Sequence, residues 1–262
     1  MRLSLGKIVS IPLIMDRRAF TVIELLIVII IIGIMMAVLW RSAFYSMEPT
    51  RCQRCIKRLE QIGVALLQYH QEHGTFPPAY SVDEEENPLH SWRVLIAPYL
   101  PVDEKDKPVG EIQFDEPWDS ENNTAFHQKM PRVFWGVGSG GQSTYKMIVG
   151  EKTAAGTSMA SWKRKPSEVI LLIEAWPPVL WMSPNDFSYD DFDTAIYPNE
   201  LKNRDPENGI VSFEDRNPDK KPVIGCYHPT EHHVLFADGI VKTYKNWKKP
   251  SVRELQMMCQ IE

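Results

Sequence analysis

The carboxy-terminal part of the chain contains the residues whose types and spacing most readily suggest chemistry. The segment from His228 to Asp238 also includes His232 and His233, and histidine and carboxylate side chains are common zinc ligands. His232 and His233 are adjacent, however, so on a strand their side chains face opposite sides of the sheet. Asp238 precedes Gly239, and this pair is typical of a tight hairpin turn. We therefore interpret His228 and Asp238 as structural, with His228 hydrogen-bonding across the hairpin base. A metal-dependent enzyme or ligand-binding domain that uses these two residues is the alternative.

A second candidate metal site is the acidic segment 185–193, whose sequence is NDFSYDDFD. Its carboxylates are Asp186, Asp190, Asp191 and Asp193. Calcium prefers clustered carboxylate oxygens, but this spacing fits no defined calcium-binding loop. We expect a solvated acidic turn, and calcium is the only cofactor that this segment leaves open.

Motifs for nucleophilic or phosphate chemistry are absent from the sequence. There is no Gly-x-Ser-x-Gly, no His-Glu-x-x-His and no phosphate-binding loop. The glycine-rich segment 135–143 contains no lysine, and we expect it to form a flexible loop. We therefore predict no catalytic residue and a protein that is not an enzyme.

The chain has four cysteines, Cys52, Cys55, Cys226 and Cys259. Outside the cytoplasm such residues tend to form disulfides, and four of them allow three connectivities. The Cys52-x-x-Cys55 spacing occurs in redox and zinc motifs, but on a helix it needs a second pair of ligands to bind zinc. A bond from Cys55 to Cys226 or to Cys259 would join the helix to the hairpin or to the terminal helix. The sequence leaves this connectivity open.

Among the elements that must position these residues, the one with the strongest pattern is an apolar run near the amino terminus. From Leu25 to Trp40 every residue is apolar or glycine. With residues 20–24 the run gives about 31 Å of helix, close to the thickness of a bilayer core. A buried core helix and a cleaved secretory signal are the alternatives, but the unbroken apolarity opposes the first. No clear small-x-small cleavage site follows the run, which opposes the second.

Glu24 interrupts this apolar run, and an acidic residue within a bilayer costs about 2.5–3.5 kcal/mol. No basic residue lies within the run itself. If the chain were cut between Ala19 and Phe20, the new amino group would lie about one helical turn from Glu24. That amine could pair with the carboxylate in the same chain or in a neighbouring copy.

The segment RRAFTVIELLIVIIIIGIM resembles the class III signal of type IV pilins and type II secretion pseudopilins. In that signal two basic residues, here Arg17 and Arg18, precede a small residue and the scissile bond. An aromatic residue, here Phe20, follows the bond, and the glutamate stands four residues later. The resemblance implies a prepilin peptidase that cuts before Phe20 and methylates the new amine. The usual residue before the cut is glycine, whereas this chain has Ala19.

The same resemblance implies an inner-membrane protein that crosses the membrane once and carries its carboxy-terminal domain outside the cytoplasm. The basic residues on the two flanks of the apolar run do not decide the orientation by themselves. The true start is either Met1 or Met15, since a short leader from Met15 also suits the signal. We assign a leader over 1–19, a transmembrane helix over 20–41, an amphipathic stem helix over 42–74 and a soluble domain over 75–262.

The stem helix is predicted from apolar or small residues at helical spacing. They occupy positions 52, 55, 56, 59, 62, 63, 66, 67 and 70. Gly74 should end this helix, and Pro49 should kink it or break it locally.

Strands are expected over 144–150 and 167–175, with a hairpin over 232–245. Ser251 and Glu254 form a capping box that opens a terminal helix. The fold class is α+β, with a pilin-like long helix packed on an antiparallel sheet.

Five segments of the chain resemble a group of prepilin-like proteins of unknown function. They are residues 56–80, 90–100, 114–123, 173–190 and 228–239. That group is marked by a carboxy-terminal His-x9-Asp-Gly motif, here His228, Asp238 and Gly239. The resemblance implies a non-enzymatic, pseudopilin-like structural protein of a type II secretion or type IV pilus-like system. Its implied partners are the prepilin peptidase, the membrane, and other pseudopilin-like subunits or copies of itself. The net charge of −5 argues against a nucleic-acid partner.

Overall fold

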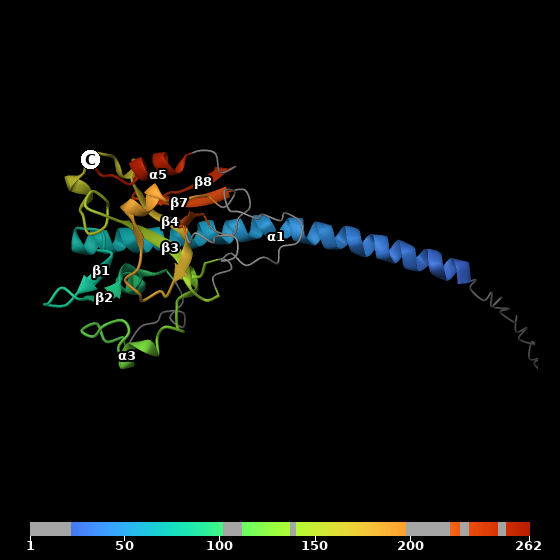
Figure 1. Ribbon diagram of the computed structural model, residues 1–262, viewed down its shortest axis with the longest axis horizontal. Coiled ribbons are helices and arrows are strands. Elements are labelled where there is room, and N and C mark those ends of the chain that lie inside the picture. Colours follow the sequence, from blue (N-terminus) through green and yellow to red (C-terminus); the bar gives the residue numbers. More distant parts are fainter. Residues whose placement is uncertain (1–21, 102–111, 137–139, 198–220, 226–230, 246–249) are drawn as a thin grey trace, which may run out of the picture. The chain divides into compact units, whose positions relative to one another are not determined.

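The structure is a computed structural model that describes residues 22–101, 112–136, 140–197, 221–225, 231–245 and 250–262 (Figure 1). The side chains of residues 40–52 are not described. The chain divides into two compact units, Met1–Met47 and Glu48–Glu262. The boundary between these units falls within the first helix, which contributes residues to both.

That first element, helix α1, extends from Val22 to His73. Between Val22 and Leu39 it is long and apolar enough to cross a membrane, and none of that segment is buried within the protein. Pro49 was expected to kink the helix or to break it, and the break is not found, because the helix is assigned through this residue. A proline inside a helix removes one backbone hydrogen bond and is ordinarily accommodated by a kink, so the predicted kink stays a prediction.

Within the second unit, the stem half of α1 presents one buried side to the rest of the domain. The fully buried side chains are those of Cys55, Leu59, Ile62, Ala65 and Leu66. These positions recur at helical spacing, so the predicted apolar stripe is confirmed.

The stem ends where the sequence predicts. Gly74 adopts φ +77°, a left-handed conformation that glycine reaches without strain. Its amide donates to the carbonyl of His70 at 2.8 Å, which closes the last turn of the helix.

A six-stranded sheet forms the centre of the domain, with the order β5-β3-β4-β7-β8 and with β6 paired to β4. Its strands are β3 (Ser143–Val149), β4 (Ile170–Val179), β5 (Phe187–Ser188), β6 (Val223–Ile224), β7 (Glu231–Phe236) and β8 (Val241–Lys245). All described pairings between these strands are antiparallel except β3 with β5. The strands predicted over 144–150 and 167–175 are therefore present. The second starts later than expected because Pro166–Glu168 form a 3-10 turn.

Two core clusters lie on opposite faces of this sheet, as the alternation of side chains along a strand requires. Leu172 of β4 and Leu235 of β7 belong to the cluster that contains the stem residues Leu59 and Leu66. The neighbouring pair Ile173 and Val234 belongs to the other cluster. That second cluster also contains side chains from helix α5 (Val252–Met258). The stem and α5 therefore cover different faces of one sheet.

Smaller elements complete the domain. A two-stranded sheet pairs β1 (Tyr80–Val82) with β2 (Pro88–Ser91), and short helices follow as α2 (Trp92–Leu95) and α3 (Glu121–Thr124). The predicted capping box is formed, since Ser251 accepts from the amide of Glu254 and Glu254 accepts in return from the amide of Ser251. The α+β fold class is thereby established.

Candidate functional site

The histidines of the carboxy-terminal segment lie on β7, and the structure separates them. His232 and His233 are both buried, and they pair with Tyr244 and Thr243 of β8 respectively. The His232 ring stacks against Tyr244 at 5.3 Å, while Nδ1 of His233 lies 3.0 Å from the Thr243 hydroxyl. Burial, and secondarily His233, lowers the pKa of His232 to about 4. His232 is therefore neutral under physiological conditions and packs as an aromatic side chain.

Asp238 and Gly239 form the hairpin turn, as predicted. The Asp238 carboxylate accepts from the amide of Ile240 at 3.0 Å, and Gly239 adopts φ +83°. A Cβ on Gly239 would also approach Leu67 of the stem to 2.8 Å. His228 lies outside the described residues, so its predicted bond across the hairpin base stays a prediction.

The acidic segment differs from the solvated turn that we expected, and the difference concerns Asp186. Its side chain is almost wholly buried and forms a bidentate ion pair with Arg93 of α2, at 2.8 and 3.3 Å. The same carboxylate accepts from the Trp92 indole and from the amide of Met147. The carbonyl of Tyr145 takes a further hydrogen bond from Arg93. The expectation is therefore wrong for this aspartate, because Arg93 supplies a buried counter-charge.

The other three aspartates belong to the 3-10 helix Tyr189–Asp193. Asp191 accepts from the amide of Ser188 at 2.8 Å and so caps this helix, while Asp190 and Asp193 are exposed. Asp186 forms its ion pair with Arg93, so the four carboxylates do not converge on one point. Across the part of the chain that the structure describes, no group of three or more His, Cys, Asp or Glu side chains is placed to hold a metal ion.

Two of the four cysteines are described, and both are present as thiols. Cys55 lies on the stem side of the sheet, whereas Cys259 lies in the cluster beneath α5. A bond between Cys55 and Cys259 is therefore not formed, because the sheet separates them. The side chain of Cys52 and all of Cys226 lie outside the described residues.

A polar group that sequence reasoning missed lies between the stem and the sheet. Glu174 of β4, Tyr145 of β3 and Cys55 of α1 are all fully buried. Tyr145 and Glu174 are direct partners in the β3–β4 register. The only signal in the sequence is a glutamate inside the apolar run of β4. We call these three residues the carboxyl cluster.

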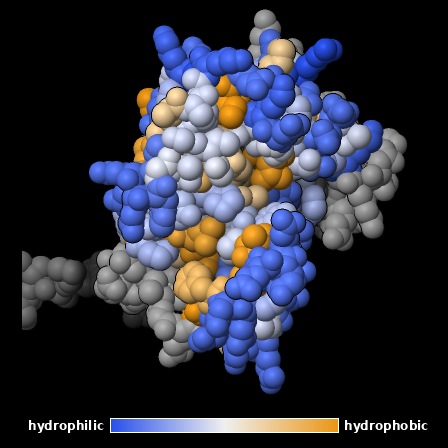
Figure 2. Space-filling view, turned by 90° about the vertical axis from the view of Figure 1, so that its left-hand side faces the viewer, coloured by the Kyte–Doolittle hydropathy of each residue, from blue (hydrophilic) through white to orange (hydrophobic). Residues whose placement is uncertain are grey.

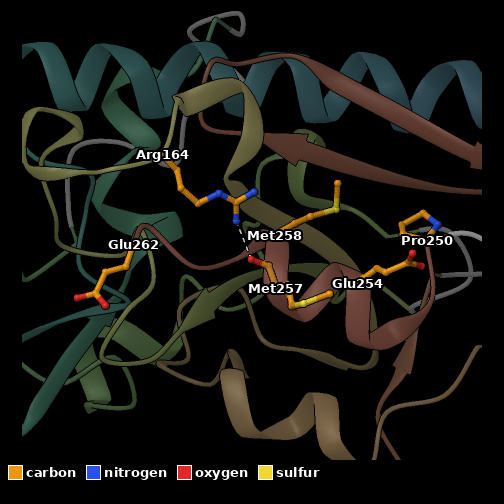
Figure 3. A pocket seen from close by; sticks show the side chains of 6 residues that line it. All are labelled: Arg164, Pro250, Glu254, Met257, Met258 and Glu262. Atoms are coloured by element: carbon orange, nitrogen blue, oxygen red, sulfur yellow. Dashed lines mark hydrogen bonds between the residues drawn. The ribbon is translucent and has the colours of Figure 1, made fainter.

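Among the described residues, a hollow of about 460 Å³ lies beside the terminal helix (Figure 3). Two of its charged residues, Arg164 and Glu254, hold that helix, and the third, Glu262, pairs with Lys152 at 2.9 Å. Arg164 donates to the carbonyl of Met257 at 2.7 Å, and Glu254 belongs to the capping box. The remaining lining residues are Pro250 and Met258. The hollow therefore lacks a set of uncommitted polar groups that would orient a substrate.

The face of the domain in Figure 2 gives a similar picture. Its apolar residues form small separate patches between polar and charged side chains. Such scattered apolar residues are normal for a protein surface. This face therefore presents no broad apolar surface for a partner.

The remaining candidate site is the amino-terminal signal. Glu24 lies in the first described turn of α1. Arg17, Arg18, Ala19 and Phe20 precede the described residues. The features that identify this site are therefore its sequence and the apolar helix that follows it.

Comparison with known families agrees with this interpretation. Residues 14–40 match the prokaryotic N-terminal methylation motif, and the apolar helix within this range is a candidate membrane anchor. Residues 48–137 match the family described as protein of unknown function (DUF1559). The chain thus combines a prepilin-type methylation motif with a region that matches this family of unknown function. The His-x9-Asp-Gly segment lies outside the matched residues. No curated protein and no solved structure is significantly similar to the chain.

Proposed function

We propose that the protein is a non-enzymatic, pseudopilin-like structural protein of a type II secretion or type IV pilus-like system. One observation carries this proposal: the match to the prepilin methylation motif over residues 14–40 includes an exposed apolar helical segment of membrane-spanning length, Val22–Leu39. A prepilin peptidase cuts the chain between Ala19 and Phe20. The helix then anchors the protein in the inner membrane, with the domain outside the cytoplasm.

In this proposal Glu24 is the assembly charge. Once the leader is removed, the amino group of Phe20 lies about one turn from the Glu24 carboxylate. An ion pair between these groups, within one chain or between neighbouring copies, offsets the cost of a carboxylate in the bilayer. The partners are the peptidase, the membrane, and other pseudopilin-like subunits or copies of this chain. No nucleic acid is involved.

In this proposal the structural role requires no metal, no cofactor and no catalytic residue. The described geometry supports this view, because Asp186 is committed to Arg93 and the two buried histidines face opposite sides of the sheet. In the hollow beside α5, Arg164 and Glu254 likewise hold the helix ends. A structural role is therefore supported, because these candidate groups already form contacts that hold the fold together.

Amino-terminal sequencing of the protein extracted from membranes tests the proposal directly. We expect a mature chain that begins at Phe20 with a methylated amine, and a strain without its prepilin peptidase should retain the leader. Ala19→Gly, which restores the usual residue before the cut, should be processed at least as fully. A mature chain that starts at Met1 or Met15 would contradict the proposal.

Glu24→Ala tests the assembly charge. We expect the variant to be processed, inserted and folded, but to lose incorporation into assemblies, because the amine of Phe20 then has no carboxylate partner. Incorporation is measured by cross-linking neighbouring copies through the membrane helix in intact cells. Glu60→Ala, which removes an exposed carboxylate from the stem, is the matched control and should assemble normally. Normal cross-linking of Glu24→Ala would remove this role for Glu24.

A further inference from the structure

The carboxyl cluster joins three elements that are distant in the chain. Cys55 comes from the stem half of α1, Tyr145 from β3 and Glu174 from β4, and each side chain has an exposed fraction of 0%. Leu59, one turn after Cys55, packs in the same core cluster as Tyr145. The cluster therefore lies at the contact between the stem and the sheet.

The Glu174 carboxyl group is enclosed without the partners that an ionised carboxylate requires. Its oxygens and the Tyr145 hydroxyl have no N–H or O–H hydrogen-bond partner among the described residues, and the donor that reaches Glu174 is the Cys55 thiol. The Cys55 thiol is a neighbour of both groups, but a thiol is only a weak donor. A buried carboxylate without strong donors is costly, whereas the protonated form avoids that cost.

Arg58, one turn further along α1 than Cys55, is a cation whose charge acts on Glu174. It favours the ionised form of Glu174, but it is a smaller influence than burial. Its guanidinium donates to the carbonyl of Trp135 at 2.7 Å. This hydrogen bond holds it at the edge of the cluster, so Arg58 is no direct partner for the carboxylate.

The other elements packed against Glu174 supply few titratable groups. On β7, His233 occupies the position next to Val234 and, by strand alternation, shares the sheet face of Glu174. His233 is itself engaged with Thr243 at 3.0 Å. The strand β6 contributes a backbone contact, since the amide of Gly225 donates to the carbonyl of Glu174. On α1 and β3 the titratable groups near Glu174 are Cys55, Arg58 and Tyr145.

Burial is the first cause of the unusual titration of this cluster. It raises the pKa of Glu174 to about 7, while the Cys55 thiol and, to a lesser extent, Arg58 lower it. Burial also raises the pKa of Cys55 and of Tyr145, and Glu174 adds to both shifts. The thiol and the phenol therefore stay protonated near neutral pH. Glu174 is the member of the cluster that changes charge there.

We propose that the protonation state of Glu174 controls the contact between the stem helix and the sheet. The neutral side chain packs in this contact, and the ionised side chain weakens the contact. We call this proton-dependent contact the clasp. The native state then holds a proton that the unfolded chain releases at an ordinary glutamate pKa. Where the native state binds more protons, stability falls as the pH rises. The contact with the stem is therefore at full strength below the ordinary glutamate pKa, and its contribution is lost as the pH rises from there through the pKa of about 7 in the folded protein. This clasp does not depend on pilin-type assembly, because every group in it belongs to residues 48–262.

Hydrogen exchange of the full chain in detergent tests the clasp at the stem itself. We compare the protection of amides 55–70 at pH 5 and pH 8, after correction for the intrinsic rate of exchange, in the wild type and in Glu174→Gln. For the wild type we expect protection to fall roughly tenfold or more at the higher pH. Glu174→Gln keeps a neutral side chain of similar shape, so its protection should not depend on pH. Glu60→Gln, on the exposed side of the same stem, should behave as the wild type.

Two results would overturn the clasp. One is a wild-type stem whose protection is the same at both pH values, and the other is a pH dependence that Glu174→Gln retains. A carboxyl NMR titration of glutamate-labelled wild-type protein keeps the test decisive if the variant does not fold. A Glu174 midpoint between about 6 and 8 supports the clasp, whereas a midpoint near the ordinary glutamate value contradicts it.

Discussion

Asp186→Ala is expected to lower the free energy of unfolding of the domain by about 3–5 kcal/mol. The substitution leaves the Arg93 guanidinium buried without its carboxylate, and a lone buried charge is far costlier than a buried pair. It also removes the acceptor of the Trp92 indole and of the Met147 amide. Burial lowers the pKa of Arg93 and raises that of Asp186, while each charge opposes the shift of the other. Each residue therefore stabilises the charged form of the other.

Urea unfolding of the full chain in detergent, followed by near-ultraviolet circular dichroism, measures this effect. Asp190→Ala removes an exposed carboxylate from the same segment and should change stability by less than about 0.5 kcal/mol. The double variant Arg93→Met with Asp186→Leu should recover the part of the loss that comes from the lone Arg93 charge, since an apolar pair can replace a buried ion pair. The part that comes from the Trp92 indole and the Met147 amide should remain, because both still lack their acceptor. A loss below about 1 kcal/mol for Asp186→Ala would show that Arg93 is stabilised by other groups.

Leu66→Ala is expected to destabilise the same domain by about 2–5 kcal/mol. Leu66 is fully buried in the core cluster under the stem, and its removal leaves a cavity between α1 and the sheet. Val64, two positions earlier, points away from the sheet and is 45% exposed. Val64→Ala therefore serves as the control and should cost less than about 1 kcal/mol.

The same urea experiment distinguishes the two variants. If Leu66→Ala and Val64→Ala had equal effects, the stem would not be an integral part of the core, and the pilin-like packing would be wrong. Hydrogen exchange should also show which contact is lost. Leu66→Ala should release the amides of the stem before those of the central strands β3 and β4, because the stem is the layer that loses contacts.

Much of the fold follows from residues that are close in the sequence. The apolar run identifies the candidate membrane helix, and the stripe from Cys55 to Leu66 identifies the buried side of the stem. The hairpin turn at Asp238 and Gly239 and the capping box at Ser251 are likewise local patterns. Each depends on backbone geometry and spacing within a few residues. Short-range patterns of this kind are visible without knowing which elements meet.

The roles of the charged residues depend on contacts over long separations. In the sequence, Asp186 is one of four aspartates in an acidic segment, and Arg93 is far away from it. Only the packing of α2 against the strand β3 and the segment before β5 brings the two charges together in a dry site. The pairing of β3 with β4 likewise places Tyr145 beside Glu174, and the stem covers both.

The sequence by itself thus determined the prepilin signal, the candidate anchor, the stem and the α+β class. The tertiary structure decided which polar groups are buried and what each one faces, and so it assigned Asp186 to an ion pair and Glu174 to the contact with the stem. The physical reason is that hydrophobic periodicity and turn chemistry act locally. Desolvation and charge pairing, in contrast, are set by neighbours that only the folded chain brings together.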